Sequence, residues 1–297
     1  MTHPILRTIR GFLATGLAGA ALLGAAAADP AATDWVENDF GRSRLVAAYD
    51  AVGPAGSGPV LLGWQMELDD GWKTYWRTPG EAGLPPVFDF AGSINLAAAE
   101  IRFPLPERFE LFGIETYGYG GLVTLPLEVA LEEDGGALRI AAKVDYMVCK
   151  DICVPLQESY LLTLEPARGA QTFSAHRGAI FTALQRVPQA WESADQALSV
   201  TAVRLTAGPD KSERLTVIAA NATGAVMDLI VELPEPFEPG KRTIEFAGDG
   251  SWTAFTYPIL PADGAGLGGA EVVLTLSDQT GAAIERRITL PGRTASR

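Results

Sequence analysis

The chain has 297 residues, 47% of them hydrophobic and 20% charged, which is enough to build cores for two domains of ordinary size. Its formal net charge of −13 at pH 7 is spread along the chain, and an acidic surface repels phosphate backbones. The composition therefore argues against nucleic acid as a partner and is typical of a folded globular protein.

The first 28 residues have the three parts of a secretory signal peptide. Arg7 and Arg10 give a basic start without any acid, and an apolar run and a stretch of alanines follow before Asp29. The apolar run has about 15 residues, fewer than the roughly 20 that a membrane-spanning helix needs. We expect cleavage near Ala28 and export to the periplasm. The alternative is an uncleaved N-terminal anchor.

The region from residue 29 to 168 consists of short β-rich runs separated by Gly- and Pro-containing turns. Many short strands with regular turn signals predict a β-sandwich or a barrel. Four of the aromatic residues in this region, Trp64, Trp72, Tyr75 and Trp76, lie close together in the sequence. Aromatics in a β-sandwich usually belong to the core, so we favour that interpretation over a carbohydrate-stacking platform.

The two cysteines of the chain, Cys149 and Cys153, are separated by three residues and flanked by alternating apolar residues. The alternation predicts one strand on each side, with each cysteine on the more polar face. A tight hairpin would place the cysteines opposite each other, with Cα atoms about 4.5–5.5 Å apart. That distance suits a disulfide. On one straight strand the same two residues would be about 13 Å apart.

Three functions remain open for this pair. A ring of about five residues stabilises a fold by only about 2 kcal/mol, so a purely structural disulfide is a poor brace and redox exchange is favoured. Alternatively, the two thiolates and Met147 form a soft ligand set that suits Cu(I). The third alternative is a non-catalytic sandwich that binds proteins and carries a structural disulfide. With one histidine outside the predicted signal peptide, a structural zinc site lacks ligands.

Residues 172–187 interrupt the β pattern with apolar residues spaced at 3.6 residues, which predicts one amphipathic helix ending before Pro188. Strand-like runs resume from about residue 197 to 291 and contain no cysteine. The residues therefore predict an all-β protein with two β blocks joined by a short helix.

Three segments carry a resemblance to a known family: VDYMVCKDICVP at 144–155, GWKTYWRTPGEAGLPP at 71–86, and RFPLPERFELFGIETYGYGGLVTLPLEV at 102–129. From about residue 35 to 290 the chain resembles the N-terminal periplasmic region of ScsB-like members of the DsbD family of thiol–disulfide reductases. The short C-x3-C spacing favours the ScsB-like branch.

The resemblance implies two immunoglobulin-like β-sandwich domains in tandem, joined by a short helix. The implied organisation is a signal peptide at 1–28, a redox domain at 29–168, a helical linker at 169–190 and a second domain at 191–297. No cofactor is implied.

The resemblance also implies the roles of particular residues. Cys149 and Cys153 form the redox pair of a thiol–disulfide oxidoreductase that relays electrons, and Cys153 is the sulfur that joins the mixed disulfide. The cap loop, whose aromatic side chain shields the cysteines, corresponds to Glu110, Leu111, Phe112 and Gly113.

The implied partners are thioredoxin-like periplasmic proteins. Full-length members of the family continue into membrane helices and a thioredoxin-like domain, whereas this sequence ends at Arg297. We therefore expect a separate membrane thiol transporter as the electron donor.

Overall fold

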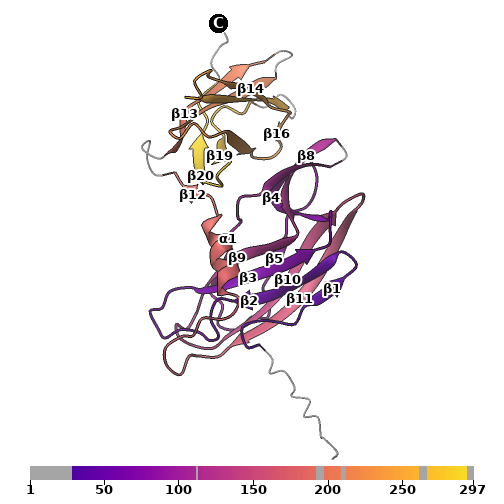
Figure 1. Ribbon diagram of the computed structural model, residues 1–297, viewed down its shortest axis with the longest axis vertical. Helices are drawn as coiled ribbons and strands as arrows, with labels where there is room; N and C mark the ends of the chain where they lie inside the picture. Colours follow the sequence, from indigo (N-terminus) through magenta and orange to yellow (C-terminus); the bar gives the residue numbers. More distant parts are fainter. Residues whose placement is uncertain (1–28, 112, 192–196, 209–211, 261–265, 293–297) are drawn as a thin grey trace, which may run out of the picture.

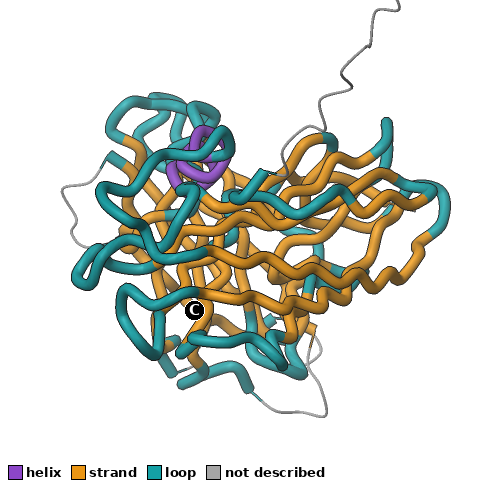
Figure 2. Tube along the Cα trace, turned by 90° about the horizontal axis from the view of Figure 1, so that it is seen from below, coloured by secondary structure: helices purple, strands orange, loops and turns teal. Residues whose placement is uncertain are grey.

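The computed structural model describes residues 29–111, 113–191, 197–208, 212–260 and 266–292. The predicted signal peptide at 1–28 lies outside these residues. Strands dominate, as the sequence predicts, and in the ranges just given α1 (Arg177–Gln185) is the one α-helix. In Figure 2 it is the purple segment beside the strands. Within the same ranges, no helix is both long and apolar enough to cross a membrane. The predicted all-β class is confirmed.

The first group of strands builds a sandwich around one apolar core (Figure 1). Its strands are Val36–Asn38 (β1), Gly41–Ala47 (β2), Val60–Leu68 (β3), Lys73–Gly80 (β4), Val87–Asp89 (β5), Ala98–Ile101 (β6), Glu107–Leu111 (β7), Ile114–Gly120 (β8), Leu122–Ala130 (β9), Leu138–Cys149 (β10) and Cys153–Leu164 (β11). One sheet has the order β1-β2-β3-β9-β6 and the other β11-β10-β4-β8-β7, with β5 paired to β10.

The remaining strands form a second sandwich with its own core, at the other end of the long axis of the molecule (Figure 1). They are Gln189–Ala190 (β12), Leu198–Ala207 (β13), Glu213–Asn221 (β14), Met227–Glu232 (β15), Glu238–Pro239 (β16), Thr243–Phe246 (β17), Thr253–Leu260 (β18), Glu271–Asp278 (β19) and Ala283–Thr289 (β20). The sheets have the orders β12-β20-β19-β15 and β13-β14-β18-β16, with β17 paired to β18.

The alternation around the cysteines forms the predicted hairpin. β10 and β11 have 12 residues each and pair antiparallel from Leu138 and Leu164 to Cys149 and Cys153. Residues of one parity are buried in the core: Ile140, Ala142, Val144, Tyr146, Val148, Tyr160, Leu162 and Leu164. A one-residue shift would turn this whole face towards water, so burial fixes the register and brings the cysteines opposite each other.

The helix is shorter than the predicted 172–187, because α1 begins only at Arg177. The backbone of Thr172 and Ser174 instead bonds to the segment that follows β2, which holds these residues in an extended conformation. Phe173, predicted on the apolar face of the helix, therefore precedes it and is 50% exposed. Competing backbone pairing overrides the helical period here.

The helix packs on the first sandwich. Ile180 is fully buried in a small cluster with Val46 and Ala48 of that sandwich. Just after the helix, the Arg186 carbonyl accepts a hydrogen bond from the Leu105 amide at 2.7 Å. These contacts fix the end of the helix, from which the chain enters β12 of the second sandwich.

A buried polar cluster in the first core gives a test of the packing. The Tyr160 hydroxyl lies 2.7 Å from Ser43 Oγ and accepts a hydrogen bond from Trp64 Nε1 at 3.0 Å. Tyr160→Phe leaves both partners buried without this contact, so we expect the free energy of unfolding to fall by about 1–3 kcal/mol. Urea denaturation measures this change. Ser159→Ala, on the exposed face of the same strand, is the control, and an equal loss in both variants would contradict the packing argument.

Asp228 of β15 in the second sandwich and Arg108 of the first form one of the ion pairs between the two sandwiches. Asp228 Oδ1 accepts a hydrogen bond from Arg108 Nη2 of β7 at 3.0 Å, and Arg242 also donates to it. Burial alone would raise the pKa of Asp228, but the two guanidinium groups outweigh burial and hold the pKa below its usual value.

This lowered pKa predicts a pH dependence of stability. The folded-state pKa of Asp228 lies below the unfolded value of about 3.9, so its contribution is present above that pH and is lost as the pH falls through the folded pKa. We expect Asp228→Asn to lower the melting temperature at pH 7 and the difference from wild type to shrink towards pH 2.5. Thermal unfolding across this range checks it. The exposed Glu271→Gln is the control, and a difference that does not depend on pH would contradict the assignment.

Candidate functional site

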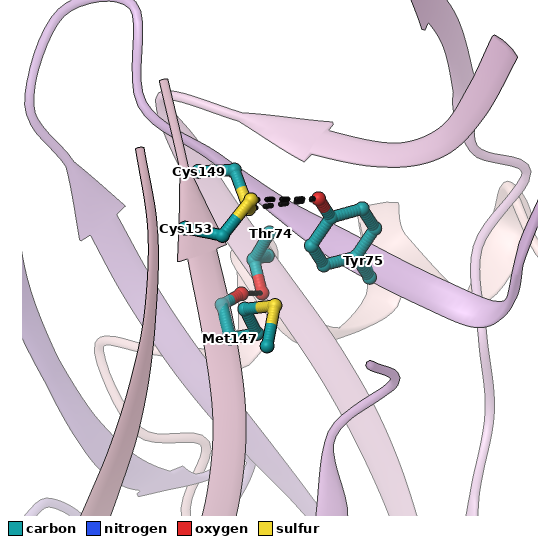
Figure 3. Close-up of a disulfide and its surroundings, with 5 residues drawn as sticks. All are labelled: Thr74, Tyr75, Met147, Cys149 and Cys153. Carbon is teal, nitrogen blue, oxygen red and sulfur yellow. Dashed lines mark hydrogen bonds between the residues drawn. A yellow bond between two sulfur atoms is a disulfide. The ribbon is translucent and has the colours of Figure 1, made fainter. Parts of the chain in front are cut away.

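The cysteine pair closes the end of the β10–β11 hairpin. Cys149 and Cys153 are directly opposite in the register and form a disulfide, with their Cα atoms 4.2 Å apart. The predicted juxtaposition across a tight loop is confirmed. In Figure 3 both sulfurs lie at the end of the hairpin, next to β4.

The two sulfurs differ in their surroundings. The sequence predicts both cysteines on a polar, open face, but Cys149 is fully buried whereas Cys153 is exposed. The reason is that β10 has a neighbour on each side at this point, since Cys149 also pairs with Lys73 of β4. β11 is the edge strand, so its cysteine faces solvent. An approaching thiolate therefore reaches Cys153 first.

Tyr75 of β4 covers the buried sulfur. Its hydroxyl donates a hydrogen bond to Cys149 Sγ at 2.8 Å and lies 3.8 Å from Cys153 Sγ (Figure 3). Burial raises the pKa of the Tyr75 hydroxyl, so it stays a protonated donor at neutral pH. A donor at this position stabilises a thiolate on Cys149 more than it stabilises the disulfide.

Two glycines allow Tyr75 to occupy this position. Gly83 has a φ of 109°, and a Cβ there would lie 2.2 Å from Tyr75 Cε1. Gly118 pairs with Tyr75, and a Cβ there would lie 1.9 Å from the Thr74 carbonyl oxygen. A residue other than glycine at position 83 would collide with the Tyr75 ring, and one at position 118 would collide with the backbone of Thr74.

Three of the four aromatic residues belong to the core, as predicted. Trp64 and Trp76 are fully buried in the first core, and Trp72 packs partly buried against it. Tyr75 is also fully buried but lies outside that core, against the disulfide and Gly83. The sequence interpretation missed the hydroxyl of Tyr75, because periodicity assigns a residue to a face but does not show what lies beside it. The available signal was the polar group itself, since a buried tyrosine hydroxyl usually has a partner.

Two other residues near the pair make hydrogen bonds to neighbouring segments of the chain. Lys150, in the loop between the cysteines, donates to the Asp70 carbonyl at 3.0 Å. Met147 is two residues from Cys149 on β10, and its carbonyl accepts a hydrogen bond from Thr74 Oγ1 at 3.0 Å. In the described ranges, no group of three or more His, Cys, Asp and Glu residues is placed to hold a metal ion.

The predicted cap residues fall on the β7–β8 hairpin. Glu110 lies on β7 and is exposed, and Gly113 follows in the turn with a φ of 84°. Phe112 and the side chain of Leu111 lie outside the described part of the structure. Shielding of the cysteines by this loop therefore stays a prediction.

The arrangement can support thiol–disulfide exchange. Exchange needs an accessible sulfur, a leaving thiolate that is stabilised, and a second thiol close enough to resolve the mixed disulfide. Exposed Cys153 is the accessible sulfur, and Cys149, which accepts the Tyr75 hydrogen bond, is the stabilised leaving thiolate. Because the two cysteines lie opposite each other, Cys149 is also close enough to resolve a mixed disulfide on Cys153. Next to the pair, Ile152 is 61% exposed, which leaves an apolar side chain free beside Cys153.

Comparison with known proteins agrees with this chemistry. Residues 42–165, which include both cysteines and Tyr75, match the family described as thiol:disulfide interchange protein DsbD, N-terminal. No curated protein matches the chain. Among solved structures, the N-terminal periplasmic domain of ScsB from Proteus mirabilis is similar, with a TM-score of 0.69 and 23% identity over 88% of this chain and 99% of that one.

The similarity to that structure shows the fold, an all-β, immunoglobulin-like arrangement of several sheets that extends beyond the matched residues. The family match covers the strands that carry the disulfide and its tyrosine. Residues 42–165 of this chain are therefore a DsbD-family N-terminal domain.

Proposed function

We propose that the protein is a periplasmic thiol–disulfide oxidoreductase that relays electrons to partner proteins through Cys149 and Cys153. The observation that carries the proposal is the asymmetry of the pair: Cys153 is exposed, while Cys149 is buried under the Tyr75 hydroxyl. A disulfide that served only as a brace would need neither an open sulfur nor a donor on the other.

The reduction step begins with a thiolate of a dithiol donor protein. This thiolate attacks Cys153 Sγ, the bond between the two cysteines breaks, and Cys149 leaves as a thiolate that accepts the Tyr75 hydrogen bond. The second donor thiol then attacks the mixed disulfide, which releases Cys153 as a thiolate and oxidises the donor. The pair gains two electrons, and both thiolates exchange protons with water.

In the delivery step the reduced cysteine pair passes its two electrons to the disulfide of an oxidised client protein. The Cys153 thiolate attacks the client disulfide and forms a mixed disulfide, and Cys149 then attacks Cys153 Sγ. The intramolecular disulfide re-forms and the client leaves as a dithiol, so electrons and protons balance over the cycle.

The partners follow from this role. The donor is a membrane thiol transporter, and the clients are thioredoxin-like periplasmic proteins. Export by the segment at 1–28 places the protein in the compartment where these partners meet. The cap residues Glu110, Leu111, Phe112 and Gly113 shield the pair between encounters, and the redox domain at 29–168 acts ahead of a second domain at 191–297.

The test measures electron transfer between this protein and a thioredoxin-like protein in both directions. We expect the oxidised chain to take up two electrons from a reduced thioredoxin-like protein, and the reduced chain to reduce an oxidised one, each within seconds to minutes. Alkylation followed by mass measurement counts the thiols. No transfer in either direction, together with tight one-to-one uptake of Cu(I) by the reduced chain, would replace this proposal with the copper-binding alternative.

A further inference from the structure

The outer face of β15 contacts the first sandwich. Along this strand Met227, Leu229 and Val231 face the core of the second sandwich. The alternate residues Asp228, Ile230 and Glu232 therefore point the other way. Ile230 is 4% exposed and clusters with the buried residues of the first core. We call these three alternate residues the β15 clamp.

One arm of the β15 clamp holds β4 just after the tyrosine that covers the disulfide. Glu232 accepts hydrogen bonds from Arg77 Nε, at 3.1 and 3.2 Å, and from Thr78 Oγ1. The Arg77 guanidinium lies over the Trp76 ring, 4.2 Å from its centroid. Tyr75 is the residue immediately before this trio.

These contacts lie where the regular backbone pairing of β4 with β8 is interrupted. Tyr75 pairs with Gly118 and Gly80 with Thr116, so residues 76–79 of β4 face only Tyr117 of β8. A bulge of this kind interrupts the ladder of backbone hydrogen bonds and redirects the side chains beside it. The position of the bulge, and of the tyrosine before it, therefore depends on side-chain contacts.

The other arm holds the residue that faces the bulge. Arg108 donates to Asp228 and to the Leu229 carbonyl, each at 3.0 Å, and also to the Tyr117 hydroxyl at 2.9 Å. Tyr117 in turn packs edge-on against Trp76, with ring centroids 6.5 Å apart. Both arms of the clamp thus converge on the bulge.

A cavity lies beside the β15 clamp, where the two sandwiches are not in direct contact. It has a volume of about 400 Å³ and lies between the sandwiches, where Glu110 and Gly113 of the first face Phe237 and Lys241 of the second. On the β7–β8 hairpin, Arg108 is the described residue that donates hydrogen bonds across the interface, and the residues after it border the cavity. The clamp therefore acts on the base of this hairpin and on β4.

We infer that Asp228, Ile230 and Glu232 are positioning residues for the redox pair: through the bulge in β4 they hold the Tyr75 hydroxyl on Cys149 Sγ. The second sandwich, which carries no cysteine, thereby takes part in the chemistry of the first. The inference rests on the proposed redox function of the pair. It assigns a role to the contact between the sandwiches, which a spacer domain would not need.

The experiment measures the acidity of Cys149 in full-length protein. In a Cys153→Ser background, the rate of alkylation as a function of pH reports the Cys149 thiol alone. We expect Glu232→Gln to raise the pH midpoint of Cys149 alkylation by about 0.5, which corresponds to about a threefold loss of thiolate at neutral pH. Tyr75→Phe should raise the same midpoint further. Asp228→Asn, which preserves side-chain shape, gives a second and independent variant.

The decisive comparison is a double-mutant cycle with Tyr75→Phe. If the clamp acts through the tyrosine, Glu232→Gln has no further effect on the midpoint once the hydroxyl is gone. Equal effects in both backgrounds, or no shift in either clamp variant, would overturn the inference. Glu271→Gln, which removes an exposed ion pair elsewhere in the second sandwich, is the matched control. The thiol titration needs no partner protein, so its result is independent of whether electron relay succeeds.

Discussion

We expect Cys153→Ser to abolish electron transfer and to form almost no mixed disulfide, whereas Cys149→Ser should also abolish turnover but accumulate a mixed disulfide. The difference follows from exposure, because the cysteine that remains in Cys153→Ser is the buried Cys149. In Cys149→Ser the exposed Cys153 still attacks a partner disulfide, but the thiol that resolves the adduct is missing. Non-reducing electrophoresis with an oxidised thioredoxin-like protein distinguishes the two outcomes.

A small aromatic disulfide reagent allows the reactivity of the two single-cysteine variants to be compared without a partner protein. We expect the thiol of Cys149→Ser to react at least about tenfold faster than that of Cys153→Ser, since exposure and thiolate character set thiol reactivity. Ser159→Ala, exposed on the same strand, keeps both cysteines and full turnover. Equal reactivity of the two single thiols would contradict the assignment of Cys153 as the entry sulfur.

We expect Tyr75→Phe to slow exchange by about 10- to 100-fold, although both cysteines remain. A hydrogen bond to a charged group contributes about 1.5–3 kcal/mol, and the Tyr75 hydroxyl makes this bond fully only when Cys149 is a thiolate. Loss of the donor raises the pKa of the Cys149 thiol, which makes it a poorer leaving group when Cys153 is attacked. Stopped-flow reduction of the disulfide by dithiothreitol measures the rate.

The matched control for this substitution is Tyr49→Phe, which changes a half-buried tyrosine on the first sandwich that packs at a tilt against Phe173. It removes the same hydroxyl group without affecting the disulfide. We expect its exchange rate to equal that of wild type. A rate in Tyr75→Phe that also equals wild type would remove the tyrosine from the mechanism and leave exposure of Cys153 as the determinant of reactivity.

The sequence predicts the hairpin well because burial of alternate residues fixes its register. From Ile140 to Leu164 each apolar residue constrains the strand, so the opposition of the cysteines follows from parity and a short loop. The same reasoning predicts two β blocks around a helix. The helix boundary was wrong, since the backbone from Thr172 to Ser174 pairs with a distant segment that periodicity does not reveal.

The unequal surroundings of the two sulfurs could not be predicted from the sequence. Parity places Cys149 on the polar face, but whether that face is open depends on which strand lies next to β10. The neighbour is β4, which is more than 60 residues away in the chain and brings Tyr75 with it. The contact between Glu232 and Arg77 is a similar case, because it joins two sandwiches whose strands give no sequence signal of their relative position.

The reduction potential of the Cys149–Cys153 pair tests the central claim most directly. Equilibration with glutathione or dithiothreitol buffers, followed by thiol trapping, gives this value. An exchange-active pair is predicted to lie above about −300 mV, within reach of thioredoxin-like proteins. A potential well below about −300 mV would mark the bond as a structural disulfide and would contradict the redox role.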